Sequence, residues 1–420
     1  ANYVYLGNDA DTLYFTTTAG APNWRVIAVD RAAPSAASAR TIVPEAAAAI
    51  ESADIAGGRV LVSYVQDARN VVRLFERDGR PVGDVHLPGS GSAGNFEARS
   101  DEAEAFFSFS DYLAPTRILR LDATTNTVSA FRTPKVDADT SVYVTRQVFY
   151  ASKDGTKVPM SITHRRDMPR DGNQPVLLYG YGGFNISLTP TFRPTVLAWL
   201  EMGGVYAEAN LRGGGEYGEA WHDAGTLTHK QNVFDDFIAA AEFLIREQYT
   251  QPSRLVISGR SNGGLLVGAV MVQRPELFGA ALPGVGVLDM LRYQLASANA
   301  RQWSGDFGLS DQPDEFKALY AYSPVHNVKK GVCYPPTLVT TADRDDRVVP
   351  WHSYKFAAAL QTAQGCANPV LIRIETRAGH GAGKPVWMQI EDFADQWAFA
   401  AKALGMPAPA ATVPTASPAP

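Results

Sequence analysis

The segment RLVISGRSNGGLLVGAVMVQRPELFG, residues 254–279, decides the fold. Its first part, 254–259, has the pattern of a buried strand, and helical spacing resumes at Leu265. Ser261 lies in the turn between them, with a glycine two positions before it and another two positions after it. A plain tight turn is one interpretation. In this strand–turn–helix context, however, Gly-x-Ser-x-Gly predicts a nucleophile elbow, a turn so sharp that a Cβ at either glycine would meet neighbouring backbone.

A serine hydroxyl becomes a useful nucleophile only beside a histidine base, which an acid must orient. On an α/β-hydrolase sheet the chain order is serine, acid, histidine. His380 follows the last strand-like segment in a glycine-rich loop that can bring an imidazole over the sheet edge. We favour it over His326, which lacks a strand end, and over His352, which begins a helical stretch.

The acid is expected where a strand ends, and the segment TLVTTADRDDRVVP, residues 337–350, supplies three aspartates. Asp343 is closest to the strand and could instead bond loop amides. Spacing alone leaves the choice between Asp345 and Asp346 open.

Strand-like and helix-like segments alternate from about residue 175 onward, which predicts a mostly parallel sheet covered on both faces. A hairpin around Asp154 and Gly155 precedes them. We therefore expect an α/β-hydrolase domain over residues 136–407. The Pro/Ala-rich tail, 408–420, cannot bury apolar surface and is predicted to be disordered.

The first 135 residues show short alternating stretches instead, apart from an alanine-rich patch, Glu45 to Ile50, that resembles a short helix. Similar arginine-bearing stretches recur around Arg25, Arg73 and Arg117, each after a partner strand. A repeat of about 40 to 50 residues with several strands is typical of propeller blades. About three blades fit, and propellers typically close with at least four. We therefore expect a partial propeller with upstream blades outside this chain; a complete three-hairpin β domain is the alternative.

Composition excludes some classes of protein. The net charge is −5 and the pI near 5.9, which argues against a nucleic-acid partner. No apolar run approaches the roughly 20 residues that span a bilayer, so no membrane insertion is expected. The chain opens with Ala1 and shows no signal-peptide pattern, which suggests removal of an earlier start or a longer parent protein.

The two cysteines, Cys333 and Cys366, do not have metal-ligand spacing, and we expect no metal. Each precedes a strand-like segment, so the thiols could bond if those strands are parallel neighbours; two unrelated small side chains are the alternative. A disulfide would indicate an oxidising compartment. Together with the Pro/Ala-rich tail it favours a bacterial periplasm, with the cytoplasm as the alternative location.

Five segments in this order resemble the prolyl oligopeptidase family of serine peptidases: YGYGGFN (179–185), NLRGGGEYGEAWHDAG (210–225), GRSNGGLL (259–266), TADRDDRVVP (341–350) and AGHGAGKP (378–385). The family joins a β-propeller to an α/β-hydrolase domain. The resemblance implies that Ser261 is the nucleophile, Asp345 the orienting acid and His380 the base. It also implies an oxyanion hole made by the Tyr181 hydroxyl and the backbone amide of Asn262.

The family divides by substrate, since one branch cleaves after proline and another after basic residues. RQWSGDFG, residues 301–308, is similar to the proline branch, in which a tryptophan stacks on the proline ring. The resemblance implies this role for Trp303, and carbonyl binding for Arg347, whose alternative is an ion pair with Asp343 or Asp346. It implies apolar walls from four further residues: Phe184, Val287, Val348 and Phe307. Phe307 stands where the family often has tyrosine.

The expected function is therefore a monomeric serine oligopeptidase that cleaves proline-containing oligopeptides after proline through an acyl-enzyme. No cofactor is expected: the glycine-rich NLRGGGEYG lacks the phosphate-binding pattern, and we interpret it as a structural loop beneath the site. An esterase or acyl-peptide hydrolase on the same fold is the second hypothesis. A catalytically impaired fragment is the third.

Overall fold

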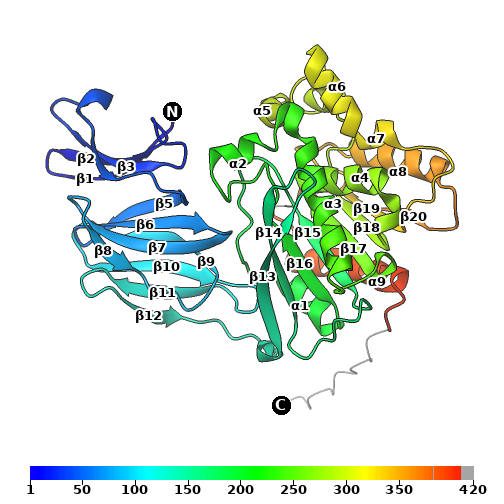
Figure 1. Cartoon of the computed structure of the whole chain (residues 1–420), viewed down its shortest axis with the longest axis horizontal. Helices are drawn as coiled ribbons and strands as arrows, with labels where there is room; N and C mark the ends of the chain where they lie inside the picture. The colour runs from blue at the N-terminus through cyan, green and yellow to red at the C-terminus, as the bar shows by residue number, and fades with distance from the viewer. Residues whose placement is uncertain (382, 408–420) are drawn as a thin grey trace.

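The N-terminal part of the computed structural model consists of three four-stranded antiparallel sheets, which lie side by side in chain order (Figure 1). The structure describes residues 1–381 and 383–407. The three sheets are β1 (Tyr3–Asp9), β2 (Thr12–Thr17), β3 (Arg25–Asp30) and β4 (Arg40–Val43); β5 (Ala49–Ala56), β6 (Arg59–Gln66), β7 (Arg69–Glu76) and β8 (Pro81–Asp84); and β9 (Ser92–Ala98), β10 (Glu104–Ser110), β11 (Arg117–Asp122) and β12 (Thr127–Arg132). We call these sheets the blade region.

The repeat seen in the sequence corresponds to one sheet. Arg25, Arg73 and Arg117 each lie in the third strand of their sheet. Apolar side chains fill the space between neighbouring sheets, with Val26 and Val62 in one cluster and Leu74 and Phe107 in the next. Each sheet therefore buries its apolar face only against its neighbour, which is how propeller blades stack.

The short helix expected at Glu45 to Ile50 was wrong. Residues 45–48 have no regular structure, and Ala49 and Ile50 begin strand β5. Ile50 is buried and pairs with Tyr64 of β6. Alanine is the best helix former, but helix propensity is worth less than about 1 kcal/mol per residue, and cross-strand pairing and burial of Ile50 outweigh it.

The rest of the chain forms one eight-stranded sheet with helices on both faces, which we call the sheet region (Figure 1). Its strand order is β13-β14-β16-β15-β17-β18-β19-β20. The first two strands form the predicted hairpin, β14 pairs antiparallel with β16, and the remaining pairs are parallel. This is the predicted α/β-hydrolase arrangement. The strands are β13 (Tyr143–Ala151), β14 (Lys157–Arg165), β15 (Val176–Gly180), β16 (Val205–Ala209), β17 (Leu255–Arg260), β18 (Ala280–Gly284), β19 (Thr337–Ala342) and β20 (Val370–Glu375).

Two apolar clusters fix the layers. Side chains alternate between the faces of a strand, so Leu178 packs with α3 and α4 while Leu177 packs with α1 and α9. The α-helices are α1 (Pro194–Glu201), α2 (Glu219–Asp223), α3 (Gln231–Arg246), α4 (Asn262–Gln273), α5 (Ser304–Phe307), α6 (Pro313–Tyr322), α7 (Pro324–Asn327), α8 (Trp351–Ala363) and α9 (Val386–Ala403). The 3₁₀ helices are η1 (Ala36–Ser38), η2 (Thr140–Val142), η3 (Leu227–His229), η4 (Pro252–Arg254), η5 (Pro275–Leu277), η6 (Tyr293–Leu295) and η7 (Ala300–Trp303).

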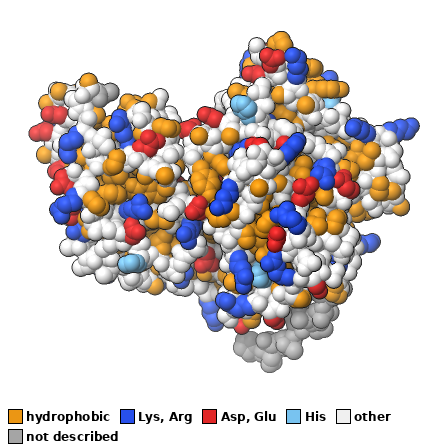
Figure 2. Space-filling view, in the orientation of Figure 1, with side chains coloured by type: hydrophobic (Ala, Val, Ile, Leu, Met, Phe, Trp, Pro, Cys, Tyr) orange, Lys and Arg blue, Asp and Glu red, His pale blue; other side chains and the backbone are white. Residues whose placement is uncertain are grey.

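A disulfide joins Cys333 and Cys366, which precede the parallel neighbours β19 and β20. The condition stated for this bond from the sequence is therefore met. The predicted disordered tail, 408–420, lies outside the described residues. Among the described helices, none is both long and apolar enough to cross a membrane. On the face in Figure 2, acidic and basic side chains are interspersed over both regions.

Candidate active site

Ser261 sits between the end of β17 and the first residue of α4, at the carboxyl edge of the sheet. Its φ of 59° and ψ of −117° are strained for a side chain of this kind. A Cβ at Gly259 would collide with the backbone of Gly263, and a Cβ at Gly263 would lie 2.7 Å from the carbonyl oxygen of Gly180. Both glycines are therefore required by close backbone approach, and this is the geometry of a nucleophile elbow.

His380 and Asp345 form a hydrogen-bonded pair, with His380 Nδ1 2.7 Å from Asp345 Oδ2. The other carboxylate oxygen accepts the backbone N–H groups of Arg347 and Val348, at 3.1 and 2.9 Å. Asp345 is buried, so these bonds hold its carboxylate in one orientation. Among the described residues, no hydrogen bond joins Ser261 Oγ to His380; bonds of this kind commonly tighten only with substrate in place.

The other candidates from the sequence lie in structural roles. Asp343 accepts the backbone N–H of Arg377 at 2.7 Å, the loop-bonding alternative considered for it. His352 is buried and its Nδ1 accepts the backbone N–H of Asp289; burial lowers the pKa of His352 to about 3. His326 Nδ1 bonds Ser323 Oγ at 2.8 Å. None of them takes part in the Asp345–His380 pair.

A cavity of about 270 Å³ opens beside Ser261. It brings together all six residues that the resemblance suggested for substrate binding and both that it suggested for the oxyanion hole. The lining residues are Tyr181, Phe184, Ile186, Ser261, Asn262, Val287, Asn299, Trp303, Phe307, Arg347 and Val348. Ile186 and Asn299 were not anticipated, because no motif or periodicity marks them.

Aromatic rings shape this cavity. Phe184 and Phe307 meet edge to face with centroids 5.3 Å apart. Behind them, the buried Tyr293 lies parallel to Trp303 at 6.4 Å and edge to face with Phe307 at 5.2 Å. Tyr293 was missed from the sequence, yet it supports both rings. The result is an apolar slot suited to a flat, rigid ring.

Arg347 lines the same cavity. Within the described part of the chain, no ion pair joins it to Asp343 or Asp346, the alternative considered from the sequence. Its guanidinium is thus available to a polar group of a ligand.

Two hydrogen-bond donors, Tyr181 and Asn262, line the cavity together with Ser261. Burial raises the pKa of Tyr181 to about 12, so its hydroxyl keeps its proton near neutral pH. Asn262 is the first residue of α4, where backbone N–H groups lack intrahelical partners. The Asn262 side chain donates to the carbonyl oxygen of Tyr181 at 2.6 Å, which ties the two together.

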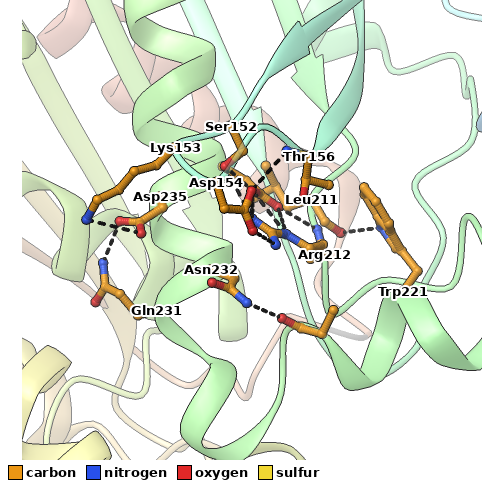
Figure 3. Close-up of polar contacts among 12 residues, drawn as sticks. Ser152, Lys153, Asp154, Thr156, Leu211, Arg212, Trp221, Gln231, Asn232 and Asp235 are labelled. Carbon is orange, nitrogen blue, oxygen red and sulfur yellow. Dashed lines mark hydrogen bonds and ion pairs between the residues drawn. The ribbon is translucent and has the colours of Figure 1, made fainter.

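Arg212, in the glycine-rich loop after β16, makes ion pairs that hold this loop (Figure 3). Arg212 pairs with the buried Asp236 at 2.6 Å and with Asp154 at 2.5 Å. The carbonyl oxygen of Gly213 accepts the backbone N–H of Asn185 at 3.1 Å. A Cβ at Gly213 would lie 2.9 Å from the carbonyl oxygen of Gly182. The glycine serves close backbone packing, as the structural interpretation predicted.

Comparisons with known proteins agree with this geometry. The sequence profile of the prolyl oligopeptidase family matches residues 190–407, and that of its N-terminal β-propeller domain matches residues 1–134. The chain is 47% identical over 407 residues to a prolyl endopeptidase of Elizabethkingia meningoseptica, covering 97% of this chain and 57% of that protein. It is 40% identical to a prolyl endopeptidase of Dictyostelium discoideum, covering 97% of this chain and 55% of that protein.

Solved structures extend the likeness. One, from a study of two prolyl endopeptidases, has a TM-score of 0.93 and 48% identity, covering 96% of this chain and 60% of that chain. Oligopeptidase B from Leishmania major gives a TM-score of 0.90 at 26% identity, covering 96% and 58%. The chain thus spans somewhat more than half the length of the relatives it matches.

Proposed function

The chain belongs to the prolyl oligopeptidase family, and we propose that it hydrolyses short peptides on the carboxyl side of proline as a serine endopeptidase. The observation that carries this proposal is the cavity that joins Ser261 to an apolar aromatic slot. Relatives named prolyl endopeptidase support the same activity.

In the proposed reaction, Ser261 Oγ attacks the carbonyl carbon of the proline residue while His380 Nε2 takes the hydroxyl proton. The Asp345 carboxylate holds the proton on His380 Nδ1 and stabilises the imidazolium that forms. The Tyr181 hydroxyl and the Asn262 backbone N–H donate to the oxyanion. His380 then protonates the leaving amine, and a water molecule, activated by the same histidine, releases the acid from Ser261.

The slot favours proline over a basic side chain. Among the described residues that line it, none carries a carboxylate that would pair with arginine or lysine. The Trp303 ring and the Phe184–Phe307 pair instead offer apolar faces to a pyrrolidine. Phe307 has no hydroxyl, so recognition on that side relies on shape and burial alone. Arg347 would bind a substrate carbonyl oxygen next to the proline.

The test compares two anilides with the same leaving group, an acyl-Gly-Pro anilide and the matching arginine anilide, and a simple acyl ester. We expect kcat/KM to be highest for the proline anilide by about 10²-fold or more, the discrimination that a well-matched apolar pocket can supply. Ser261→Ala should lose activity on the order of 10⁶-fold. Strong preference for arginine would refute the proline assignment, and preference for the ester would favour the esterase hypothesis.

A fluorophosphonate probe distinguishes this enzyme from an inactive fragment. A formed elbow should be labelled at Ser261 and not in Ser261→Ala. Absence of labelling in a folded chain would refute a working nucleophile.

We also propose that the protein acts as a monomer in a bacterial periplasm. The Cys333–Cys366 disulfide supports an oxidising compartment. Cell fractionation and light scattering test the two statements; a reduced cytoplasmic pool or a stable dimer would contradict them.

A further inference from the structure

Asp306 lies in the chain between two aromatic walls of the cavity, Trp303 and Phe307, but its carboxylate contacts a different set of groups. Asp306 Oδ1 accepts the backbone N–H of Phe184 at 2.9 Å. Oδ2 lies 3.1 Å from His222 Nε2, and Lys230 Nζ lies 3.6 Å from Oδ1. We call Asp306, His222 and Lys230 the Asp306 cluster.

Asp306 and Lys230 are buried and His222 is partly exposed, and the charges of the three groups depend on one another. The side chain of Asp306 is 6% exposed and that of Lys230 is 1% exposed. Burial alone would raise the pKa of Asp306. The hydrogen bond from His222 and the charge of Lys230 outweigh burial and hold this pKa below its usual range. Burial lowers the pKa of Lys230 to about 8, and Asp306 opposes that shift. Removing the carboxylate would leave a buried cation without its partner.

The segment that the cluster contacts is strained. Phe184 and Asn185 have φ values of 58° and 56°, in the left-handed region that bulky side chains avoid. Such conformations persist only where surrounding contacts impose them. Here Asp306 binds the N–H of Phe184, and Lys230 Nζ donates to the carbonyl oxygen of Gly182 at 3.1 Å. Both ends of Gly182–Phe184 are therefore held by buried charged groups.

Hydrogen bonds of Trp221 and Asn232, which lie close in sequence to His222 and Lys230, fix this part of the chain (Figure 3). Trp221 Nε1, next to His222, donates to the carbonyl oxygen of Leu211 at 3.0 Å. Asn232 Nδ2, near Lys230, donates to the carbonyl oxygen of Ala224 at 2.9 Å. The cluster therefore has a rigid base from which to hold the Gly182–Phe184 backbone.

We propose that Asp306 is a positioning residue, which holds Gly182–Phe184 so that Phe184 remains a wall of the substrate cavity and the Tyr181 hydroxyl remains beside Ser261. Lys230 and His222 secure the carboxylate in this role. One buried carboxylate thus couples the apolar slot to the oxyanion donor. The effect of Asp306 on catalysis rests on the proposed function, whereas its effect on the Gly182–Phe184 backbone does not.

The first arm of the test is hydrogen exchange measured by mass spectrometry on peptides that cover residues 181–188. Asp306→Ala should speed exchange in this segment about tenfold, since the Phe184 N–H loses its acceptor. Asp306→Asn keeps an acceptor oxygen and should restore part of the protection. Asp314→Ala removes an exposed carboxylate on α6 and serves as the matched control.

The second arm measures kcat and KM for a proline anilide and the matching alanine anilide. Asp306→Ala should lower kcat/KM for proline about 10²-fold and the proline-to-alanine ratio about tenfold, with Asp306→Asn between it and the parent. If Asp306→Ala does not fold, the same comparison with Asp306→Asn decides.

Three outcomes are distinguishable. A folded variant with unchanged exchange at 181–188 and an unchanged substrate ratio would overturn the proposal. Faster exchange throughout the sheet region would also overturn it, because the role would then be general stability. A parent chain that does not cleave the proline anilide would refute the proposed function instead, and the exchange arm would still decide the positioning role.

Discussion

The blade region and the sheet region are both built around β-sheets, but only one of them forms the cavity. In the blade region every strand pairs with its neighbour in the chain, so each sheet closes through local antiparallel contacts. In the sheet region the parallel strands β15 and β17 pair across 75 or more residues of chain. Every residue that lines the cavity beside Ser261 comes from the sheet region. Parallel strands bring segments that are distant in sequence to one edge of the sheet, and the cavity beside Ser261 lies at this edge.

Two tyrosines connect the blade region to the sheet region. Tyr112, in the loop after β10, packs in the apolar cluster beneath α1 and α9, and its hydroxyl donates to Glu208 Oε1 at 2.7 Å. Tyr217, in the glycine-rich loop, donates to Asp67 of the blade region at 2.9 Å. These contacts attach the blade region to the sheet region, and in the proposed function the sheet region supplies the catalytic residues. Three substitutions test this division, in decreasing order of expected effect.

Tyr181→Phe tests the chemistry of the sheet region. Loss of this donor should lower kcat by about 10²–10³, with a small change in KM, because the hydroxyl acts mainly on the oxyanion. Steady-state kinetics on the proline anilide measures it. Activity within a few fold of the parent would remove Tyr181 from the mechanism. Tyr320→Phe, at an exposed ring on α6, should change nothing.

Glu216→Gln tests packing within the sheet region, where the Glu216 carboxylate binds Leu188 and Asn210. Glu216 is buried, its Oε1 accepts the N–H of Leu188 at 2.9 Å, and burial raises its pKa to about 7. A folded-state pKa above the unfolded value gives stability that is present below about pH 4.5 and is lost as the pH rises through 7.

Urea unfolding at pH 5 and pH 8 measures this loss. The parent should lose about 2 kcal/mol more than Glu216→Gln between these values, since one pKa unit corresponds to about 1.4 kcal/mol. Equal pH dependence in both proteins would show that Glu216 does not carry a proton in the fold.

Tyr112→Phe tests attachment by the blade region. It removes one hydrogen bond to the Glu208 carboxylate, which keeps its bond from Tyr206 at 2.7 Å. We expect a loss of about 1.5 kcal/mol in unfolding free energy, with kcat/KM within about twofold of the parent. Urea unfolding and anilide kinetics check both. A large loss of activity at unchanged stability would show that the blade region takes part in catalysis, and it would contradict the division between the two regions.

Local patterns reveal some of these features and miss others. The glycines around Ser261 mark the elbow because a turn that sharp excludes a Cβ, and the repeat of strands around Arg25 and Arg73 marks the blades. The alanine-rich patch before Ile50 led to a wrong prediction, because strand pairing and burial override the helix preference of alanine, which is small per residue. The roles assigned to the six apolar and polar residues of the cavity stay predictions, although the fold brings them together.

The sequence by itself determined the elbow, the alternation of strands and helices, and the pairing of an aspartate with His380. Spacing alone left Asp345 and Asp346 open. In the folded chain Asp345 turns inward to His380 while its neighbour stays exposed. Only the tertiary structure placed Asp306 against Phe184, Tyr293 behind Trp303, and Lys230 beneath Gly182. These contacts join segments up to 122 residues apart. No local propensity encodes the contacts of Asp306 with Phe184 and of Lys230 with Gly182, because each joins connections that follow different strands of the sheet.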